Sequence, residues 1–213
     1  MRLDHVSYAV SAGELADTVQ RLGATLGAGF SDGGRHPRFG TRNFVLPLLD
    51  GVYLEVVAAL DHPAAESAPF GQAVRRRAEL GGGWLGWVVS VDDLAPLEAR
   101  LGRAAVDGDR IRPDGHRLTW RQIGLNDLID DPALPYFTQW TSPPEDHPSN
   151  LGPATVAIEG CELAGDRDKV REWLGGPIDA PIDSSAITWV TDPNEAGLVA
   201  VDFRTPHGTV RID

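Results

Sequence analysis

The feature that most constrains this chain is a short strand at its start. Leu3–Val10 alternates polar and apolar side chains, and a helical pattern follows over Glu14–Leu26. Alternation with a period of two predicts a half-buried strand. His5 would then share one face with Leu3, Ser7 and Ala9. Because Ser7 and Ala9 are small, this face leaves room beside the imidazole, and we predict a site inside a cupped sheet.

The same order of elements recurs along the chain. A strand, a helix and three further strands are expected within residues 1–60, again within 84–141, and in related form within 154–213. Residues 61–83 are predicted to be a surface connector, and the proline-rich residues 142–153 a linker. The period of roughly 70–80 residues exceeds that of solenoid repeats, so duplication of a whole module explains it better. We therefore predict an α+β fold built of consecutive βαβββ modules.

Composition narrows the classes of function. A net charge of −12 disfavours nucleic-acid binding, and the single Cys161 excludes intrachain disulfides and cysteine-based zinc sites. With no secretory leader pattern and no apolar run long enough for a membrane span, we expect a cytoplasmic protein without a membrane partner. The abundance of alanine, glycine and arginine beside one lysine is typical of bacterial coding bias. No P-loop, dinucleotide fingerprint or nucleophile elbow occurs, so no nucleotide cofactor is indicated.

Glu55 is the best partner for His5. It lies between apolar neighbours in the strand Val52–Ala59, where an unpaired carboxylate is costly to bury. It must face water, a cation or a hydrogen-bond partner. Facing each other inside one curled sheet, His5 and Glu55 would form a mixed nitrogen and oxygen site that suits Fe, Mn, Zn or Ni. The alternative is a plain hydrogen bond, since buried polar groups are usually just satisfied.

Several stretches resemble one known group of proteins. They are Leu3–Val6, Gly33–Pro37, Gly40–Asn43 and Gly51–Val57 in the first module, and Pro135–Trp140 with His147–Ser149 at the end of the second. They are similar to the glyoxalase-like domain proteins of the vicinal oxygen chelate superfamily, which includes glyoxalases, bleomycin-resistance proteins and extradiol dioxygenases. The resemblance implies that the first two modules pair into a cupped, eight-stranded sheet. It also implies one divalent metal, held by the first and last strands of each module, that chelates neighbouring oxygens of a substrate.

On this resemblance, His5 and Glu55 match the metal ligands of the first module. Counting along the second module gives Gly86 at the position of His5, and Thr138 or, after a one-residue slip, Gln139 at that of Glu55. Gln139 would be a weak third ligand through its amide oxygen.

Other residues would bind or act on the ligand. Arg35 and His36 stand in the glycine-rich stretch 29–40, predicted to be a loop over the mouth of the cup. Arg35 would bind an anionic group, and His36 would act as general base or third metal ligand. Asn43 would hydrogen-bond a ligand carbonyl or simply cap the strand that it begins.

Aromatic residues, among them Tyr53 and Trp84, would line the cup, although aromatic residues at strand spacing are more often plain core. His116, Arg117 and Arg121 of the second module are expected on an outer polar face, and an arginine among them that pointed inward would favour a carboxylate substrate.

Two functions follow as hypotheses. The first is a metal-dependent lyase, isomerase or dioxygenase in which His5 and Glu55 hold the metal and Gln139 or His36 completes the site. The second is a metal-free protein that binds and sequesters a small molecule. Because an odd number of modules leaves a sheet edge unpaired, a homodimer through residues 154–213 is a further hypothesis.

Overall fold

The computed structural model describes residues 1–176, 186–191 and 196–213. In the first module the elements are β1 (Arg2–Val10), α1 (Leu15–Leu26), β2 (Ser31–His36), β3 (Thr41–Pro47) and β4 (Tyr53–Ala59). The connector contains α2 (Pro63–Ser67) and α3 (Pro69–Glu79). The second module contains β5 (Gly83–Ser90), α4 (Ala95–Leu101), β6 (Val106–Ile111), β7 (Arg117–Ile123), α5 (Leu125–Asp130) and β8 (Tyr136–Trp140). The C-terminal part contains β9 (Ala157–Ala164), α6 (Arg167–Leu174), β10 (Ala186–Val190), β11 (Gly197–Thr205) and β12 (Gly208–Ile212).

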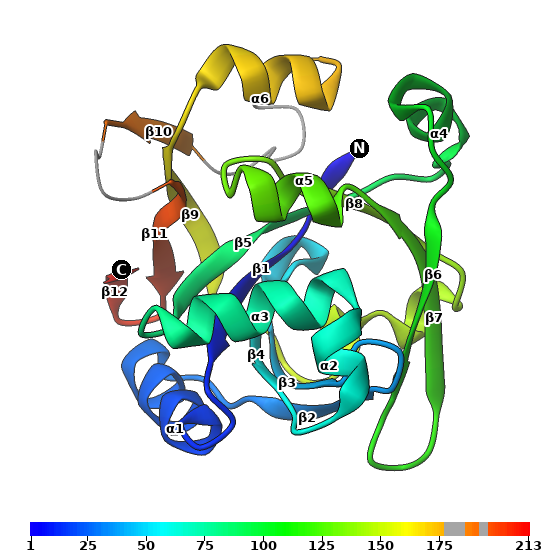
Figure 1. Cartoon of the computed structure of the whole chain (residues 1–213). Coiled ribbons are helices and arrows are strands. Elements are labelled where there is room, and N and C mark those ends of the chain that lie inside the picture. Colours follow the sequence, from blue (N-terminus) through cyan, green and yellow to red (C-terminus); the bar gives the residue numbers. More distant parts are fainter. Residues whose placement is uncertain (177–185, 192–195) are drawn as a thin grey trace.

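The first two modules form one closed barrel (Figure 1). Its strand order is β1-β4-β3-β2-β6-β7-β8-β5, so each module contributes a block of four strands. In each block the first strand pairs in parallel with the last, β1 with β4 and β5 with β8. The blocks join where β1 runs antiparallel to β5 and, more weakly, where Arg35 of β2 pairs with Ile111 of β6. The predicted fold class is thereby confirmed, with the sheet closed rather than merely cupped.

The prediction that residues 29–40 form a loop was wrong, because β2 lies within them. The glycines of β2 allow its backbone to lie close to the neighbouring strands. A Cβ at Gly33 would lie 2.2 Å from Asn43 Oδ1, and one at Gly34, whose φ is 105°, would lie 2.0 Å from the carbonyl oxygen of Ile111. Only glycine lets this strand approach both neighbours, and a glycine-rich strand carries no alternating pattern to reveal it.

The connector does more than link the modules across the surface. Phe70 and Val74 of α3 are buried against Phe39 and against Leu125 and Leu128 of α5. Figure 1 shows α2 and α3 lying across the barrel. Apolar side chains on one face of α3 therefore cover the barrel interior.

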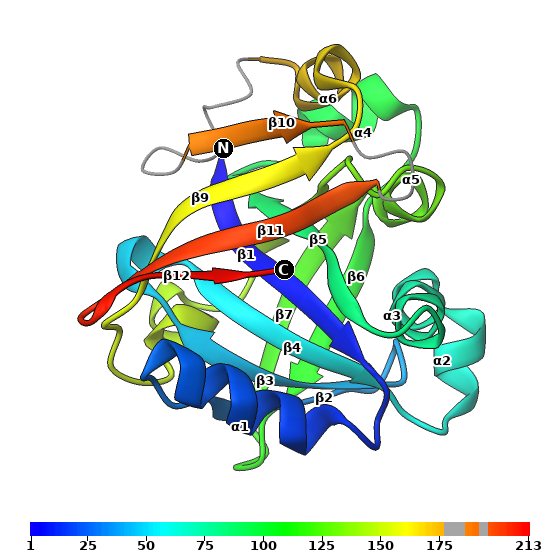
Figure 2. The same cartoon turned by 90° about the vertical axis from the view of Figure 1, so that its left-hand side faces the viewer.

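The C-terminal part has the predicted order of elements but a different sheet. Its strands are arranged β10-β9-β11-β12, so the first strand pairs with the second and third instead of the last. Figure 2 shows this sheet packed over the outside of the barrel. Trp84 of β5 stacks against Phe203 of β11 within one continuous core. Residues 177–185 and 192–195 of the predicted third module lie outside the described residues.

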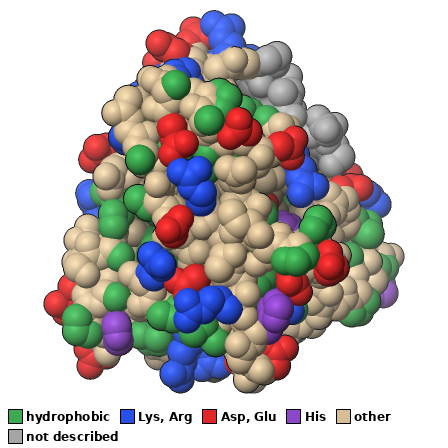
Figure 3. All heavy atoms as spheres, turned by 90° about the vertical axis from the view of Figure 1, so that its right-hand side faces the viewer, with side chains coloured by type: hydrophobic (Ala, Val, Ile, Leu, Met, Phe, Trp, Pro, Cys, Tyr) green, Lys and Arg blue, Asp and Glu red, His purple; other side chains and the backbone are tan. Residues whose placement is uncertain are grey.

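The surface is mixed in charge. On the face in Figure 3, basic and acidic side chains are interspersed. Ion pairs such as Arg121–Glu98 and Arg38–Asp109 join neighbouring elements. None of the helices in the described part of the chain is long and apolar enough to cross a membrane.

Candidate functional site

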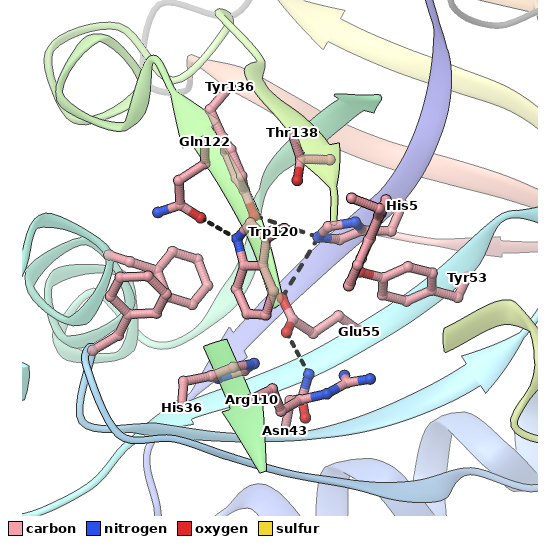
Figure 4. A pocket seen from close by; sticks show the side chains of 13 residues that line it. His5, His36, Asn43, Tyr53, Glu55, Arg110, Trp120, Gln122, Tyr136 and Thr138 are labelled. Atoms are coloured by element: carbon pink, nitrogen blue, oxygen red, sulfur yellow. Dashed lines mark hydrogen bonds and ion pairs between the residues drawn. The ribbon is translucent and has the colours of Figure 1, made fainter. Parts of the chain in front are cut away.

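A small cavity lies inside the barrel and is lined from both modules (Figure 4). Its volume is about 30 Å³, which is room for about one or two water molecules. The lining residues are His5, His36, Phe39, Asn43, Tyr53, Glu55, Phe70, Arg110, Trp120, Gln122, Tyr136, Thr138 and Trp140. Five residues predicted from the sequence are among them: His5, His36, Asn43, Tyr53 and Glu55.

An irregularity in β1 brings Asp4 and His5 together. The register of β1 against β5 shifts between Leu3 and His5. Leu3 thereby packs in the outer core with Val6, not beside His5 as alternation predicted. Successive side chains of a regular strand point to opposite faces, so the shift is what allows Asp4 and His5 to touch. Asp4 Oδ1 lies 2.6 Å from His5 Nδ1.

Asp4 is the centre of a buried hydrogen-bond network. It also accepts a hydrogen bond of 2.9 Å from Trp140 Nε1 and lies 3.2 Å from His147 Nε2. Burial raises the pKa of Asp4. Hydrogen bonds from His147 and His5 and the charges of both rings lower it by more, so the net pKa lies well below its usual range. An ionised Asp4 accepts a hydrogen bond from the Nδ1–H group of His5, which leaves His5 Nε2 as the nitrogen that can act as a base or ligand.

Glu55 faces His5 across the cavity. Its Oε2 lies 3.9 Å from His5 Nε2 and accepts a hydrogen bond of 2.7 Å from Ser7, while Oε1 accepts one of 2.6 Å from Asn43. Burial raises the pKa of Glu55, but the charges of His5 and His36 and the two hydrogen bonds lower it more. The net pKa lies below its usual value, so Glu55 is a carboxylate at neutral pH.

Two tyrosines flank His5, one from each module. The ring of Tyr53 stacks on the imidazole at 4.3 Å between centroids, and Tyr136 Oη lies 3.4 Å from His5 Nε2. Burial, reinforced by nearby carboxylates, raises the pKa of both phenols well above 10. Both tyrosines are therefore neutral hydrogen-bond donors at the cavity wall.

His36 is the second imidazole of the cavity. Its Nδ1 lies 2.8 Å from the hydroxyl of Thr41. The pKa of His36 is lowered to about 4, chiefly by burial. Arg110 and His5 also lower this pKa, and the charge of Glu55 acts in the opposite direction. His36 is thus uncharged at neutral pH.

Two predicted residues take other places. Gln139 donates a hydrogen bond of 2.9 Å to the carbonyl of Asp92 and accepts one of 3.3 Å from the amide of Leu94, outside the cavity. Arg35 is exposed and lines an outer depression of about 590 Å³. His36 lines both the depression and the cavity, so the two adjoin at this residue.

Trp84 also lies away from the cavity. Its indole Nε1 donates a hydrogen bond of 3.1 Å to the carbonyl of Ile212, and its ring faces the C-terminal sheet. Its role is to join the barrel to that sheet.

Strand register corrects the comparison between the modules. His5 pairs with Tyr53 and Ser7 with Glu55 in the first module; Val88 pairs with Tyr136 and Ser90 with Thr138 in the second. The counterpart of His5 is therefore Val88, not Gly86 as counting predicted, and the counterpart of Glu55 is Thr138.

This donor set does not fit a resident divalent metal. Val88 offers no ligand atom, Thr138 offers only a hydroxyl, and Gln139 is engaged elsewhere. Within residues 1–176, 186–191 and 196–213, no group of three or more His, Cys, Asp or Glu side chains is arranged to hold a metal ion. His5 and Glu55 alone are fewer ligands than the three or four protein side chains typical of zinc sites.

Sequence reasoning missed several members of the site. Asp4 was hidden by the bulge, and Arg110, Gln122 and Trp140 lie in short strands without a clear apolar alternation. One signal was available: Arg110, like Glu55, is a charged residue within a short strand.

The fold and the site together define a class. The molecule is a closed barrel of two βαβββ modules with a buried histidine–glutamate pair at its centre, which is a glyoxalase-type barrel. The family model described as "Glyoxalase-like domain" matches residues 3–176. The chain belongs to this family, as its sequence predicted.

One solved structure supports the fold over the whole chain, and two others are reported as similar to part of it. A hypothetical protein from Staphylococcus aureus has a TM-score of 0.63 at 15% identity, covering 100% of this chain and 85% of that one. A Streptomyces coelicolor methylmalonyl-CoA epimerase variant, solved with 2-nitronate-propionyl-CoA, has a TM-score of 0.45 at 21% identity, covering 67% of this chain and 99% of its own. The methylmalonyl-CoA epimerase of Mycobacterium tuberculosis has a TM-score of 0.44 at 20% identity, covering 67% and 89%. No curated protein sequence matches this chain.

Proposed function

We propose that this protein is an enzyme that moves a proton on a compact small molecule held inside the barrel, in an isomerase or lyase reaction. The observation that carries the proposal is the orientation of His5. Asp4 holds Nδ1 at 2.6 Å, and Nε2 is aimed toward Glu55 and Tyr136. A histidine held in this way by a carboxylate is the arrangement expected of a general base.

The neighbouring groups suit that role. His5 Nε2 would take a proton from a carbon next to a carbonyl group. The Glu55 carboxylate, 3.9 Å away, would stabilise the resulting imidazolium. The neutral phenol of Tyr136 would donate a hydrogen bond to the oxygen on which negative charge develops.

No step runs through a metal ion, because His5, Glu55 and His36 line the cavity but no three such side chains in the described part of the chain are arranged to hold one. We expect the purified, untagged protein to contain well under one equivalent of Fe, Mn, Ni or Zn, and its activity to survive chelation. Near-stoichiometric metal that is lost in Glu55→Ala would overturn this part and favour the metal-dependent hypothesis.

The alternative, sequestration of a small molecule without turnover, finds less support. Pockets for drug-sized ligands measure about 300–1,000 Å³. The cavity measures about 30 Å³, so it excludes a drug-sized compound and admits only a ligand of a few non-hydrogen atoms.

Solvent-hydrogen exchange tests the proposal. Wild-type protein in D₂O would be incubated with pyruvate, 2-oxobutyrate, lactate and hydroxyacetone, and deuterium incorporation followed by NMR. We expect exchange into at least one probe, reduced about 100-fold or more in His5→Gln, since general bases contribute about 10²–10⁴-fold. His207→Gln, an exposed histidine, is the matched control and should leave the rate unchanged. Exchange into every probe at the rate of buffer alone would refute the proposal.

A further inference from the structure

Arg110 is a charged side chain buried at the cavity. It lies in β6, is 2% exposed and lines the cavity wall. The surrounding charges pair with other partners. Asp109, its neighbour in the chain, binds Arg38 at 2.9 Å and Arg117 at 3.4 Å. Arg112 donates a hydrogen bond of 2.6 Å to the carbonyl of Asp146.

The guanidinium of Arg110 keeps unused donors. Its Nε and Nη2 are buried and have no hydrogen-bond partner among the described residues. Glu55, the acidic residue that lines the same cavity, has one oxygen bonded to Asn43 and the other to Ser7. Burying a cation without a hydrogen-bonded partner is strongly unfavourable, unless a bound ligand supplies the missing hydrogen-bond acceptors.

The chemistry of the wall selects the ligand. Arg110 presents N–H donors in a planar fork, which matches the two oxygens of a carboxylate. Gln122 Nε2, also buried without a partner among the described residues, adds a donor on the same wall. Because His36 is uncharged and Glu55 is negative, the cavity suits a single negative charge better than two. A planar monoanion therefore fits better than a phosphate dianion, and the small volume limits the rest of the molecule.

We propose that Arg110 binds the carboxylate group of a carboxylic acid of only a few non-hydrogen atoms, whose carbon next to the carboxylate or carbonyl group then faces the catalytic histidine. The inference rests on the proposed function, whose substrate class it names.

Binding measured without turnover tests this inference. Lactate, pyruvate and glycolate would be titrated into wild-type protein by calorimetry or ligand-observed NMR, beside the uncharged lactamide and hydroxyacetone and inorganic phosphate. Charge-assisted hydrogen bonds contribute about 1.5–3 kcal/mol, so we expect Arg110→Gln to weaken carboxylate binding about 10- to 100-fold. Arg110→Lys should restore part of the loss, and the exposed Arg117→Gln should bind like wild type.

Thermal unfolding separates this role from a structural one. Removing a buried, unpaired charge should leave the melting temperature of Arg110→Gln unchanged or raise it. A lowered melting temperature with unchanged carboxylate affinity would overturn the inference. Binding of none of the carboxylates, or phosphate binding as tight as theirs, would also overturn it.

The His5→Gln variant distinguishes the two proposals. It should lose exchange but keep carboxylate binding. Carboxylate binding that depends on Arg110, in a protein that catalyses no exchange, would uphold the subsite and refute the proposed reaction.

Discussion

Acidification should destabilise this protein through His36. The side chain is 4% exposed, and its pKa falls from 6.5 to about 4 on folding, chiefly because burial disfavours the imidazolium. Between these two values the unfolded chain binds the proton more tightly than the folded one. The stability present above pH 6.5 is therefore lost as pH falls toward 4.

The size of the effect follows from the two pKa values. A separation of about 2.5 pH units corresponds to about 3 kcal/mol, and most of it, about 2–3 kcal/mol, should be lost between pH 7.5 and pH 4.5. Asp4 and Glu55, whose pKa values are also lowered, act in the same direction but mainly below about pH 4. Both act mainly below the range from pH 4.5 to 7.5, so a comparison of wild type and variant within that range reports chiefly on His36.

Urea unfolding from pH 4.5 to 7.5 measures the effect in wild type and in His36→Asn, whose amide can still hydrogen-bond Thr41. The free energy of unfolding of wild type should fall by about 2–3 kcal/mol more than that of the variant over this range. His62→Asn, at an exposed histidine, is the control and should follow wild type. Parallel curves for wild type and His36→Asn would show that His36 does not titrate as its burial implies.

Three further changes probe the framework. Trp84→Phe removes a donor to the carbonyl of Ile212 and should cost about 1–3 kcal/mol in urea unfolding without altering ligand binding; altered binding at unchanged stability would contradict its structural role. Gly34→Ala places a Cβ 2.0 Å from a carbonyl oxygen at a φ of 105°, so it should lower stability by more than about 2 kcal/mol, whereas Gly13→Ala, in open space, should stay within about 1 kcal/mol; equal effects would refute the packing argument. Cys161 is buried, and burial raises the pKa of its thiol to about 12, so iodoacetamide at pH 8 should label it only after unfolding; rapid labelling of the folded protein would contradict this.

Much of the fold could be predicted from the sequence, because the patterns that indicate each strand and helix lie within short segments of the chain. Alternation in β1 and the apolar neighbours of Glu55 predicted two strands and the facing of His5 and Glu55, which the structure brings to 3.9 Å. The repeated order of elements predicted the modules, and the resemblance to the glyoxalase-like group implied that the first two of them pair. Of the two residues predicted as the counterpart of Glu55, Thr138 is the one that the strand register supports.

Other features were invisible because they depend on neighbours distant in the chain. The glycines of β2 make sense only against Asn43 and Ile111, which their missing side chains allow to approach. Counting along one strand paired His5 with Gly86, whereas the hydrogen-bonded register gives Val88.

The sequence alone determined which residues could meet inside a barrel, since the pattern of apolar positions decides which face of each strand is buried. Tertiary structure decided what those residues meet. A register shift turned Asp4 toward His5, and barrel closure left Arg110 facing the cavity with unused donors. Both results depend on the packing of strands from two modules, and no single segment encodes that packing.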